Sequence, residues 1–138
     1  MKAYHITRTS NLSGIFKEGI RPSVSGADGP GVYAWIGTLR DAVKNADLMM
    51  FNGTELSEEQ QQAKMNMFTV LELTLPFELE DPDIFDRWIN CYWDDYIVIR
   101  DAVPSDSVSD VGNFGELSKG FACNKAQSIL FGTDDCNK

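Results

Sequence analysis

An α+β domain built around a mainly antiparallel sheet is the fold class that the sequence predicts. Three observations predict it: 138 residues give room for one ordinary domain, helical periodicity is concentrated in the first third of the chain, and β-rich segments follow later. Apolar residues make up 43% of the chain, which is typical of a protein that folds around a packed core. We therefore expect one compact site and not a modular array.

The N-terminal segment predicts a strand followed by a short helix. Residues 1–7 favour a strand that runs into a turn. The next stretch, "SNLSGIFKEGIRP", places apolar residues on one helical face, with Ser10 as a candidate N-cap and Gly19 as the residue that ends the helix.

A glycine-rich loop separates this helix from the next predicted strand. Residues 23–31 read "SVSGADGPG", and the following "VYAW" predicts a strand that puts Tyr33 and Trp35 on the same face. A second amphipathic helix is predicted from Thr38. Residues 51–66 are polar, which indicates an exposed loop and a short surface helix.

The second half of the chain is dominated by predicted strands. Residues 67–75 alternate and are rich in β-formers, a second strong strand begins at Tyr96, and a weaker one is expected at residues 107–111. We expect residues 1–111 to form the domain. Residues 112–138 show little periodicity, so we expect a C-terminal extension that packs in part or ends as a frayed tail.

The charge balance disfavours some classes of partner. Twelve basic residues against twenty-one acidic ones give a formal net charge of −9, whereas binding to a nucleic-acid backbone relies on lysine and arginine. No apolar run approaches the roughly 18 residues of a membrane-spanning helix, and the start of the chain lacks the apolar stretch of a signal peptide. We expect no membrane partner and a cytoplasmic location.

The cysteines do not indicate a metal site or a disulfide framework. Cys91, Cys123 and Cys136 have no CxxC spacing, and the chain contains one histidine. Reduced thiols are the simpler interpretation, and no metal ligands are assigned.

Three short segments carry the candidate chemistry. They are "YHIT" with the single histidine, His5, then "GPGVYAW" with Tyr33, and "DDYIVIRD" with Asp94 and Asp95. Taken singly, each has an ordinary interpretation as a structural histidine, a core aromatic residue or a solvated strand start. Their order and spacing make them informative together.

The ordered motifs "HIT…NLSGIFKEGIRP…GPGVYAW…TLRDAVKNA…DYIVI" resemble the ADP-ribosyltransferase fold. They are most similar to its His-Tyr-Glu branch, which includes diphtheria-type toxins and poly(ADP-ribose) polymerases. The resemblance covers roughly residues 3–47 and 94–111. It implies a split, mainly antiparallel sheet with short flanking helices around a cleft for NAD. It also implies cleavage of the bond between nicotinamide and ribose through an oxocarbenium-like transition state, with transfer of ADP-ribose to an acceptor.

The resemblance assigns binding roles to five residues. His5 would hydrogen-bond the adenosine ribose, and Ile6, which stands where the family usually has glycine, would offer its backbone N–H and C=O to the carboxamide. Thr7 takes the place of the family's Ser/Thr hydroxyl. Tyr33 would stack on the nicotinamide ring, and Trp35 would extend that wall. The family's second stacking aromatic has no counterpart, because the nearest candidate position is occupied by Lys44.

The catalytic assignment implied by the resemblance comprises Asp95, Tyr33 and His5. Asp95 stands at the position of the family's catalytic glutamate and is one methylene shorter. Catalysis is sensitive to displacements of about 1 Å, so the carboxylate could instead come from Asp94 or from Glu72, which lies in the other strong strand.

Three functions stay open at this point. The first is a mono-ADP-ribosyltransferase that uses NAD as a substrate, without a metal, and modifies a protein in preference to a nucleic acid. The second is a catalytically impaired module that binds NAD or ADP-ribose, and the third is an acidic inhibitor that acts by binding a partner. RNA 2′-phosphotransferases share the fold and use pocket arginines, for which Arg8 is a candidate, but Tyr33 fits the His-Tyr-Glu branch better.

Overall fold

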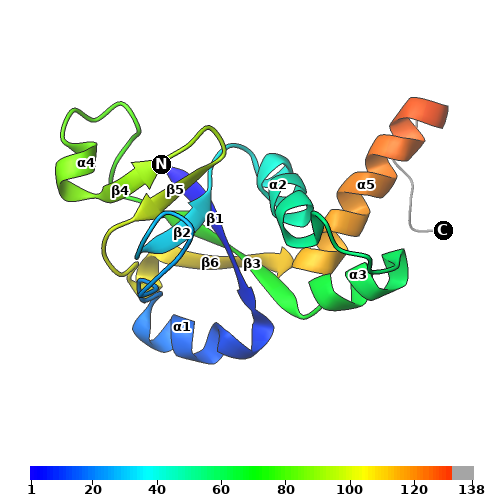
Figure 1. Cartoon of the computed structure of the whole chain (residues 1–138), viewed down its shortest axis with the longest axis horizontal. Coiled ribbons are helices and arrows are strands. Elements are labelled where there is room, and N and C mark those ends of the chain that lie inside the picture. The colour runs from blue at the N-terminus through cyan, green and yellow to red at the C-terminus, as the bar shows by residue number, and fades with distance from the viewer. Residues whose placement is uncertain (132–138) are drawn as a thin grey trace.

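Six strands form one sheet in the computed structural model, which describes the backbone of residues 1–131 and the side chains of residues 1–122. Every pairing is antiparallel, and the strand order is β4-β5-β2-β1-β3-β6. The predicted α+β class with a mainly antiparallel sheet is thereby confirmed (Figure 1). The strands are β1 (Lys2–Arg8), β2 (Val32–Trp35), β3 (Phe68–Thr74), β4 (Ile89–Tyr92), β5 (Tyr96–Ile99) and β6 (Val108–Asn113).

The sheet is weakest between β1 and β2. β1 pairs with β3 along its whole length, from Lys2↔Thr74 to Arg8↔Phe68, whereas β1 and β2 register only at Tyr4↔Trp35. β1 and β2 diverge beyond that pair (Figure 1). Side chains from both strands therefore meet at the opening, which is where the candidate site lies.

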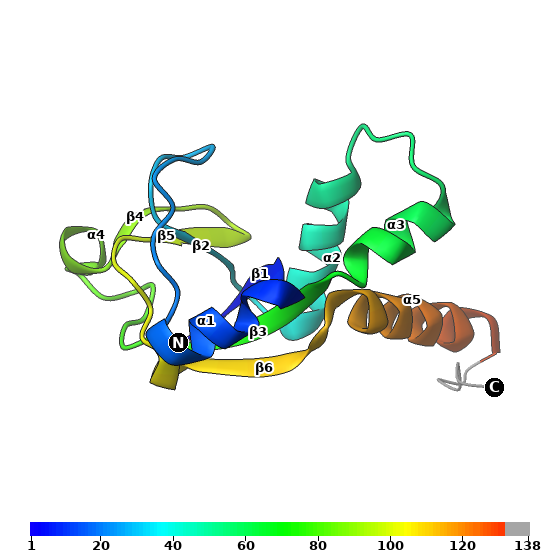
Figure 2. The same cartoon turned by 90° about the horizontal axis from the view of Figure 1, so that it is seen from below.

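Five α-helices pack around this sheet in the described residues. α2, α3 and the start of α5 lie at one end of the sheet, and α4 lies at the other end. α1 lies between these two groups, along one side of the sheet (Figures 1 and 2). The helices are α1 (Leu12–Glu18), α2 (Leu39–Phe51), α3 (Glu58–Met65), α4 (Ile84–Arg87) and α5 (Phe114–Phe131). None of the helices in the described residues is both long enough and apolar enough to cross a membrane.

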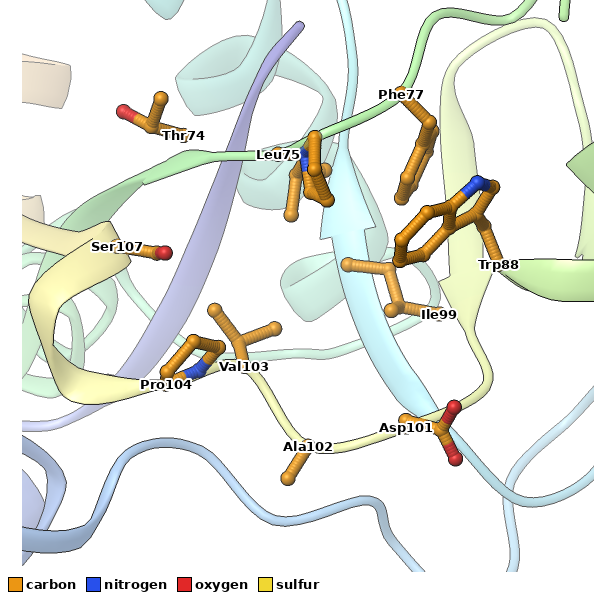
Figure 3. A pocket seen from close by; sticks show the side chains of 11 residues that line it. Thr74, Leu75, Phe77, Trp88, Ile99, Asp101, Ala102, Val103, Pro104 and Ser107 are labelled. Carbon is orange, nitrogen blue, oxygen red and sulfur yellow. The ribbon is translucent and has the colours of Figure 1, made fainter.

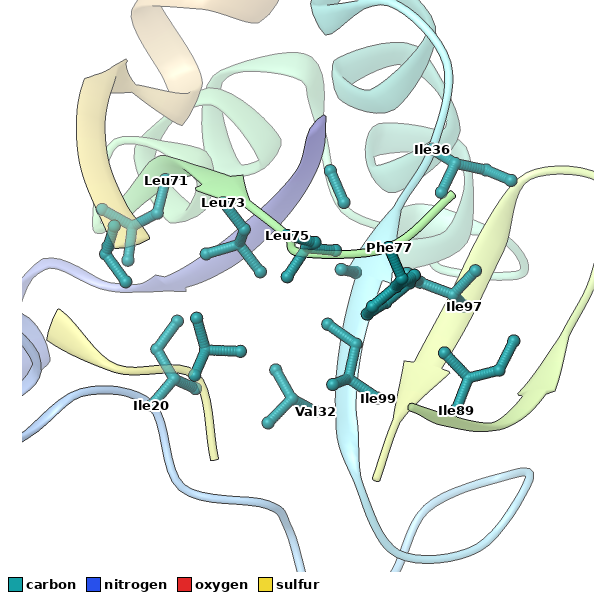
Figure 4. Packing of buried hydrophobic residues seen from close by; sticks show 14 of the residues in the cluster. Ile20, Val32, Ile36, Leu71, Leu73, Leu75, Phe77, Ile89, Ile97 and Ile99 are labelled. Carbon is teal, nitrogen blue, oxygen red and sulfur yellow. The ribbon is translucent and has the colours of Figure 1, made fainter. Parts of the chain in front are cut away.

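The strands bury apolar side chains on both faces of the sheet. Because successive side chains on a strand point to opposite faces, Ala3 and Leu71 enter one core cluster while Tyr4 and Val70 enter the other. The first cluster packs under α1 and α4 and includes several branched aliphatic residues (Figure 4). The second lies under α2, α3 and the start of α5. Burial on both faces explains why the strands read as apolar-rich segments.

Local signals at the helix ends were read correctly in two of three places. Gly19 ends α1 with φ 84°, as predicted, and Thr38 caps α2 through a reciprocal capping box with Asp41. The prediction of Ser10 as the N-cap of the first helix was wrong. Ser10 lies inside a short 3-10 turn, Thr9–Asn11, so α1 begins one residue later, after Asn11.

Three elements were not predicted: the short helix α4, the strand β4 and the helix α5. β4 pairs with β5 although its acidic, aromatic surroundings carry little alternation, and Ile89 is its one fully buried side chain. α5 follows β6 directly and is anchored by Phe114, which is fully buried. The expected extension from residue 112 thus starts within β6. The expected frayed tail falls on residues 132–138, which lie outside the described part of the chain.

Candidate functional site

A small cavity lies at the opening between β1 and β2. Its volume is about 160 Å³, comparable to the roughly 150 Å³ cavity that holds one benzene ring. His5 and Ile6 alternate in direction on β1, yet both line the cavity because the sheet splits beside them. The lining residues are His5, Ile6, Ala27, Tyr33, Ala34, Trp35, Met49 and Tyr96. Four of the five predicted binding residues are therefore brought together.

His5 bridges the two halves of the sheet. Its Nδ1 lies 2.7 Å from the carbonyl oxygen of Tyr33. A carbonyl can only accept, so Nδ1–H donates, and the neutral ring keeps Nε2 as an acceptor. Burial lowers the pKa of His5 from its usual 6.5, and the hydrogen bond to the Tyr33 carbonyl offsets this only in part. His5 is therefore neutral near pH 7 and can accept a hydrogen bond from a hydroxyl group.

The free energy of unfolding is expected to fall as the pH drops below 6.5, in part because of His5. The unfolded chain takes up a proton at the usual pKa of 6.5, whereas the folded chain does so only at a lower pH. Between these two values the loss is at most about 1.4 kcal/mol per pH unit for one group. Urea unfolding at several pH values should show a smaller acid loss for His5→Gln. Equal losses in both proteins would contradict this assignment.

Tyr33 is anchored by its hydroxyl group and presents its ring to the cavity. The hydroxyl donates to the Gly29 carbonyl at 2.6 Å and accepts from the Asp28 amide at 2.9 Å. Gly26 packs on the same side chain so closely that an added Cβ would lie 2.4 Å from the Tyr33 hydroxyl oxygen. The hydroxyl is thus occupied by the loop of residues 23–31. The part of Tyr33 that remains for a ligand is the face of its ring.

Tyr33→Phe is expected to loosen the loop of residues 23–31 without disturbing the sheet. The substitution removes two hydrogen bonds, each worth about 1 kcal/mol. Hydrogen–deuterium exchange should be faster at the amides of Asp28 and Gly29 and unchanged in β1 and β3. The matched control is Tyr92→Phe, at an exposed tyrosine on β4. Unchanged exchange in the loop of the Tyr33 variant would contradict the anchoring role.

Tyr96 completes an aromatic cluster that was not predicted. Its ring stacks on Tyr33 with centroids 6.2 Å apart and meets Trp35 edge-on at 5.8 Å. Its hydroxyl donates to the Asp28 carboxylate, which raises the pKa of Tyr96 far above its usual value. The register of β2 with β5 places Tyr96 directly opposite Trp35. In the sequence, Tyr96 could be noticed only as an aromatic residue next to Asp95. Its position opposite Trp35 follows from the register of the two strands.

Asp95 lines a larger, more open cavity beside the first. This second cavity has a volume of about 630 Å³ and shares Trp35, Met49 and Tyr96 with the small one. Asp95 lies in the bend directly before β5, where its carbonyl accepts from the Ile36 amide at 3.0 Å, and it is half-buried. Asp94 is exposed and lines neither cavity. Of the neighbouring pair, Asp95 is therefore the carboxylate closer to the aromatic cluster.

Thr7 and Glu72 lie outside both cavities. The Thr7 hydroxyl accepts a hydrogen bond from the Asn11 side chain at 3.2 Å, which ties β1 to the start of α1. Glu72 forms an ion pair with Lys2 at 3.1 Å and accepts from the Tyr4 hydroxyl at 3.5 Å. These contacts give both residues structural roles, and neither contributes to the site that His5 and Tyr33 form.

Arg8 and Lys44, the two basic residues discussed from the sequence, do not line the cavities around Tyr33. Arg8 lies over the ring of Phe68, 5.3 Å from its centroid, and Lys44 lines a separate cavity between α2 and α5. No lysine or arginine lines either cavity around Tyr33 in the described part of the chain. Among the described residues, the charged side chains in the larger cavity are Asp47 and Asp95, so these residues offer ring surfaces and acceptors and no cation.

The remaining sequence features do not form a site with these residues. Among the described residues, no cluster of three or more histidine, cysteine, aspartate or glutamate side chains is arranged to hold a metal ion. Cys91 is a half-buried free thiol on β4; the side chains of Cys123 and Cys136 lie outside the described part. A comparison with family models, curated proteins and solved structures found no match for this chain.

Proposed function

We propose that the protein is a mono-ADP-ribosyltransferase that cleaves NAD and transfers ADP-ribose to a protein acceptor. The observation that carries the proposal is the single cavity shared by His5, Ile6, Tyr33 and Trp35. These four residues come from two sequence segments, and the order of those segments resembles the His-Tyr-Glu branch. Asp95 lies in the adjoining cavity, which has room for the rest of NAD and for an acceptor group.

Each residue has a role that its geometry supports. The nicotinamide ring would lie against Tyr33, since the small cavity has the volume of one aromatic ring. The free Nε2 of His5 would accept a hydrogen bond from a ribose hydroxyl. Because neither cavity has a lysine or arginine among its described lining residues, the diphosphate would lie in solvent or against backbone groups. Affinity would then come mainly from the nicotinamide and ribose portions.

The proposed reaction breaks the bond between nicotinamide nitrogen and ribose, and the bonding electrons leave with nicotinamide. The acceptor's lone pair forms the new bond to the ribose carbon, and the acceptor proton passes to the Asp95 carboxylate. Asp95 would also hold the ribose 2′-hydroxyl and so orient the sugar during the transfer. No metal ion takes part in this scheme.

Tyr96 is stacked on the Tyr33 ring, so nicotinamide would lie in the small cavity that both rings line, and not between them. The two rings are already stacked, with centroids 6.2 Å apart, which leaves no room for a third ring between them. The Tyr96 hydroxyl is held by Asp28 of the loop of residues 23–31. The contact between Tyr96 and Asp28 therefore helps to fix one wall of the small cavity.

A second candidate, a module that binds NAD or ADP-ribose without turnover, is favoured by the position of Asp95. The carboxylate is one methylene shorter than the family's glutamate and lines the open cavity, not the small one. The acidic surface, with a net charge of −9, keeps the third candidate, an inhibitor that binds a basic partner, among the outcomes to be tested.

Incubation with labelled NAD and a cell lysate tests these functions. Labelled protein bands and released nicotinamide are expected with the unmodified chain, and both should be lost with Tyr33→Ala and His5→Ala. Tyr92→Ala, at an exposed tyrosine outside the cavities, serves as the matched control.

If no ADP-ribose is transferred, two further measurements distinguish the binding module from the inhibitor. If no nicotinamide is released but NAD raises the melting temperature, and His5→Ala abolishes that rise, the binding module replaces the transferase. If NAD has no effect and the protein instead forms a stable complex with a basic partner, the inhibitor is supported.

A further inference from the structure

A further cavity, of about 480 Å³, lies apart from the Tyr33 site. Four of its residues, Leu75, Phe77, Ile99 and Val103, belong to the core cluster under α1 and α4. It shares no lining residue with either cavity around Tyr33. Its lining residues are Thr74, Leu75, Pro76, Phe77, Trp88, Ile99, Asp101, Ala102, Val103, Pro104 and Ser107 (Figure 3).

The walls of this cavity suit a flat apolar molecule. Phe77 and Trp88 stack with ring centroids 5.5 Å apart and form one side (Figure 3). Ile99, Val103 and Leu75 add aliphatic surface around them. The volume falls in the range of roughly 300–1,000 Å³ that is typical of small-molecule sites. Aromatic and aliphatic walls of this kind favour a ring system over an extended polar ligand.

Backbone hydrogen bonds hold the two sides of the cavity in place. The N-terminal amine of Met1 donates to the carbonyls of Leu75 and Phe77, each at 2.9 Å. On the other side, Ile20 and Val103 exchange a pair of backbone hydrogen bonds at 2.8 and 2.9 Å. The cavity therefore exists before a ligand binds, which reduces the entropy that binding would otherwise remove.

The polar groups that line the cavity favour a positively charged ligand. Asp101 is the one charged residue in the lining, it is exposed, and no lysine or arginine lines the cavity within the described residues. Ser107 and Thr74 lie on the side away from Trp88 (Figure 3), and neither hydroxyl has an intramolecular hydrogen-bond partner in the described part of the chain. Asp101 would attract an ammonium group and repel a carboxylate or phosphate, whereas the Arg87 guanidinium, which is not in the lining, lies over the Trp88 ring at 5.2 Å from its centroid.

We propose that this cavity binds a small aromatic amine. The ring lies against Phe77 and Trp88, and the protonated amino group faces Asp101. A cation is favoured further by the overall charge of −9, which raises its concentration near the surface. The site is separate from the proposed NAD site, so it provides a second ligand position on the same domain.

Titration of the full chain with tryptamine tests the proposal, with indole-3-acetate as the anionic compound of the same ring. Nitrogen–proton NMR spectra should show shifts at the Trp88 indole and at the amides of Asp101 and Ser107, and none at Tyr33. Asp101→Asn is expected to weaken tryptamine binding about two- to fivefold, the range for an exposed charge pair. Asp106→Asn, at an exposed aspartate that does not line the cavity, should leave the affinity unchanged.

Three results would overturn the proposal. They are the absence of shifts with tryptamine, shifts confined to the Tyr33 side, and equal affinity for tryptamine and indole-3-acetate. Because the titration contains no NAD, its outcome is independent of the transferase assignment.

Discussion

Asp95→Ala is expected to reduce the release of nicotinamide from NAD by about 100-fold, the scale on which loss of a positioned catalytic group acts. Asp95→Glu is expected to increase it about tenfold, because the added methylene carries the carboxylate toward the small cavity that Tyr33 lines. Both follow from the place of Asp95 in the adjoining cavity, beside Trp35 and Tyr96. Release of labelled nicotinamide under single-turnover conditions measures both changes.

Matched variants separate the role of Asp95 from general effects of charge. Asp106→Ala removes an exposed carboxylate outside both cavities and should leave the rate within about twofold, as is usual for surface substitutions. Asp94→Ala decides between the two neighbours: a large loss there, with little loss at Asp95, would assign the carboxylate to Asp94. A lower rate for Asp95→Glu than for the unmodified chain would contradict the explanation that the longer side chain brings its carboxylate closer to the small cavity.

Gly19→Ala is expected to destabilise the fold by about 2 to 4 kcal/mol, which is large for a single methyl group. Gly19 ends α1 with φ 84° and ψ −172°, a conformation that side-chain-bearing residues rarely adopt. A Cβ at this position would lie 2.3 Å from the carbonyl oxygen of Val103. That carbonyl accepts from the Ile20 amide, so it cannot move away without loss of a hydrogen bond. Urea unfolding measures the change.

The matched control is Gly14→Ala in the same helix. Gly14 is exposed, and a Cβ there has nothing within 4 Å. Alanine is favoured over glycine in helices by about 1 kcal/mol, so this variant should be more stable than the unmodified chain. If both glycine variants shift stability in the same direction, the contact between Gly19 and Val103 is not the cause.

The elements that could be predicted have a signal within their own residues. β3 is rich in β-forming residues, α1 ends at a glycine, and α2 begins after a threonine with an aspartate three residues later. β4 and α5 lack such a signal. β4 exists because its backbone pairs with β5, and α5 starts where Phe114 enters the core under α2 and α3. Both depend on contacts with distant parts of the chain.

The candidate site likewise contains residues that the sequence identifies and residues that only distant contacts bring together. His5, Ile6, Tyr33 and Trp35 could be chosen from motif order, and they line one cavity. Thr7 stood next to them in sequence but lies outside the cavity, because the opening between β1 and β2 is at His5 and Ile6, and the Thr7 hydroxyl accepts a hydrogen bond from Asn11. Asp28 and Tyr96 could not be chosen, since their contact joins a loop and a strand that lie 68 residues apart.

The sequence by itself determined the class of this protein: one acidic α+β domain, with strands and helices set by periodicity, capping residues and glycine. Only the tertiary structure decided which side chains share a cavity. The split between β1 and β2 admits the His5 ring to the Tyr33 carbonyl, and the register of β2 with β5 places Tyr96 against Trp35. The physical reason is that periodicity is local, whereas a site is made by pairing and packing between residues distant in the chain.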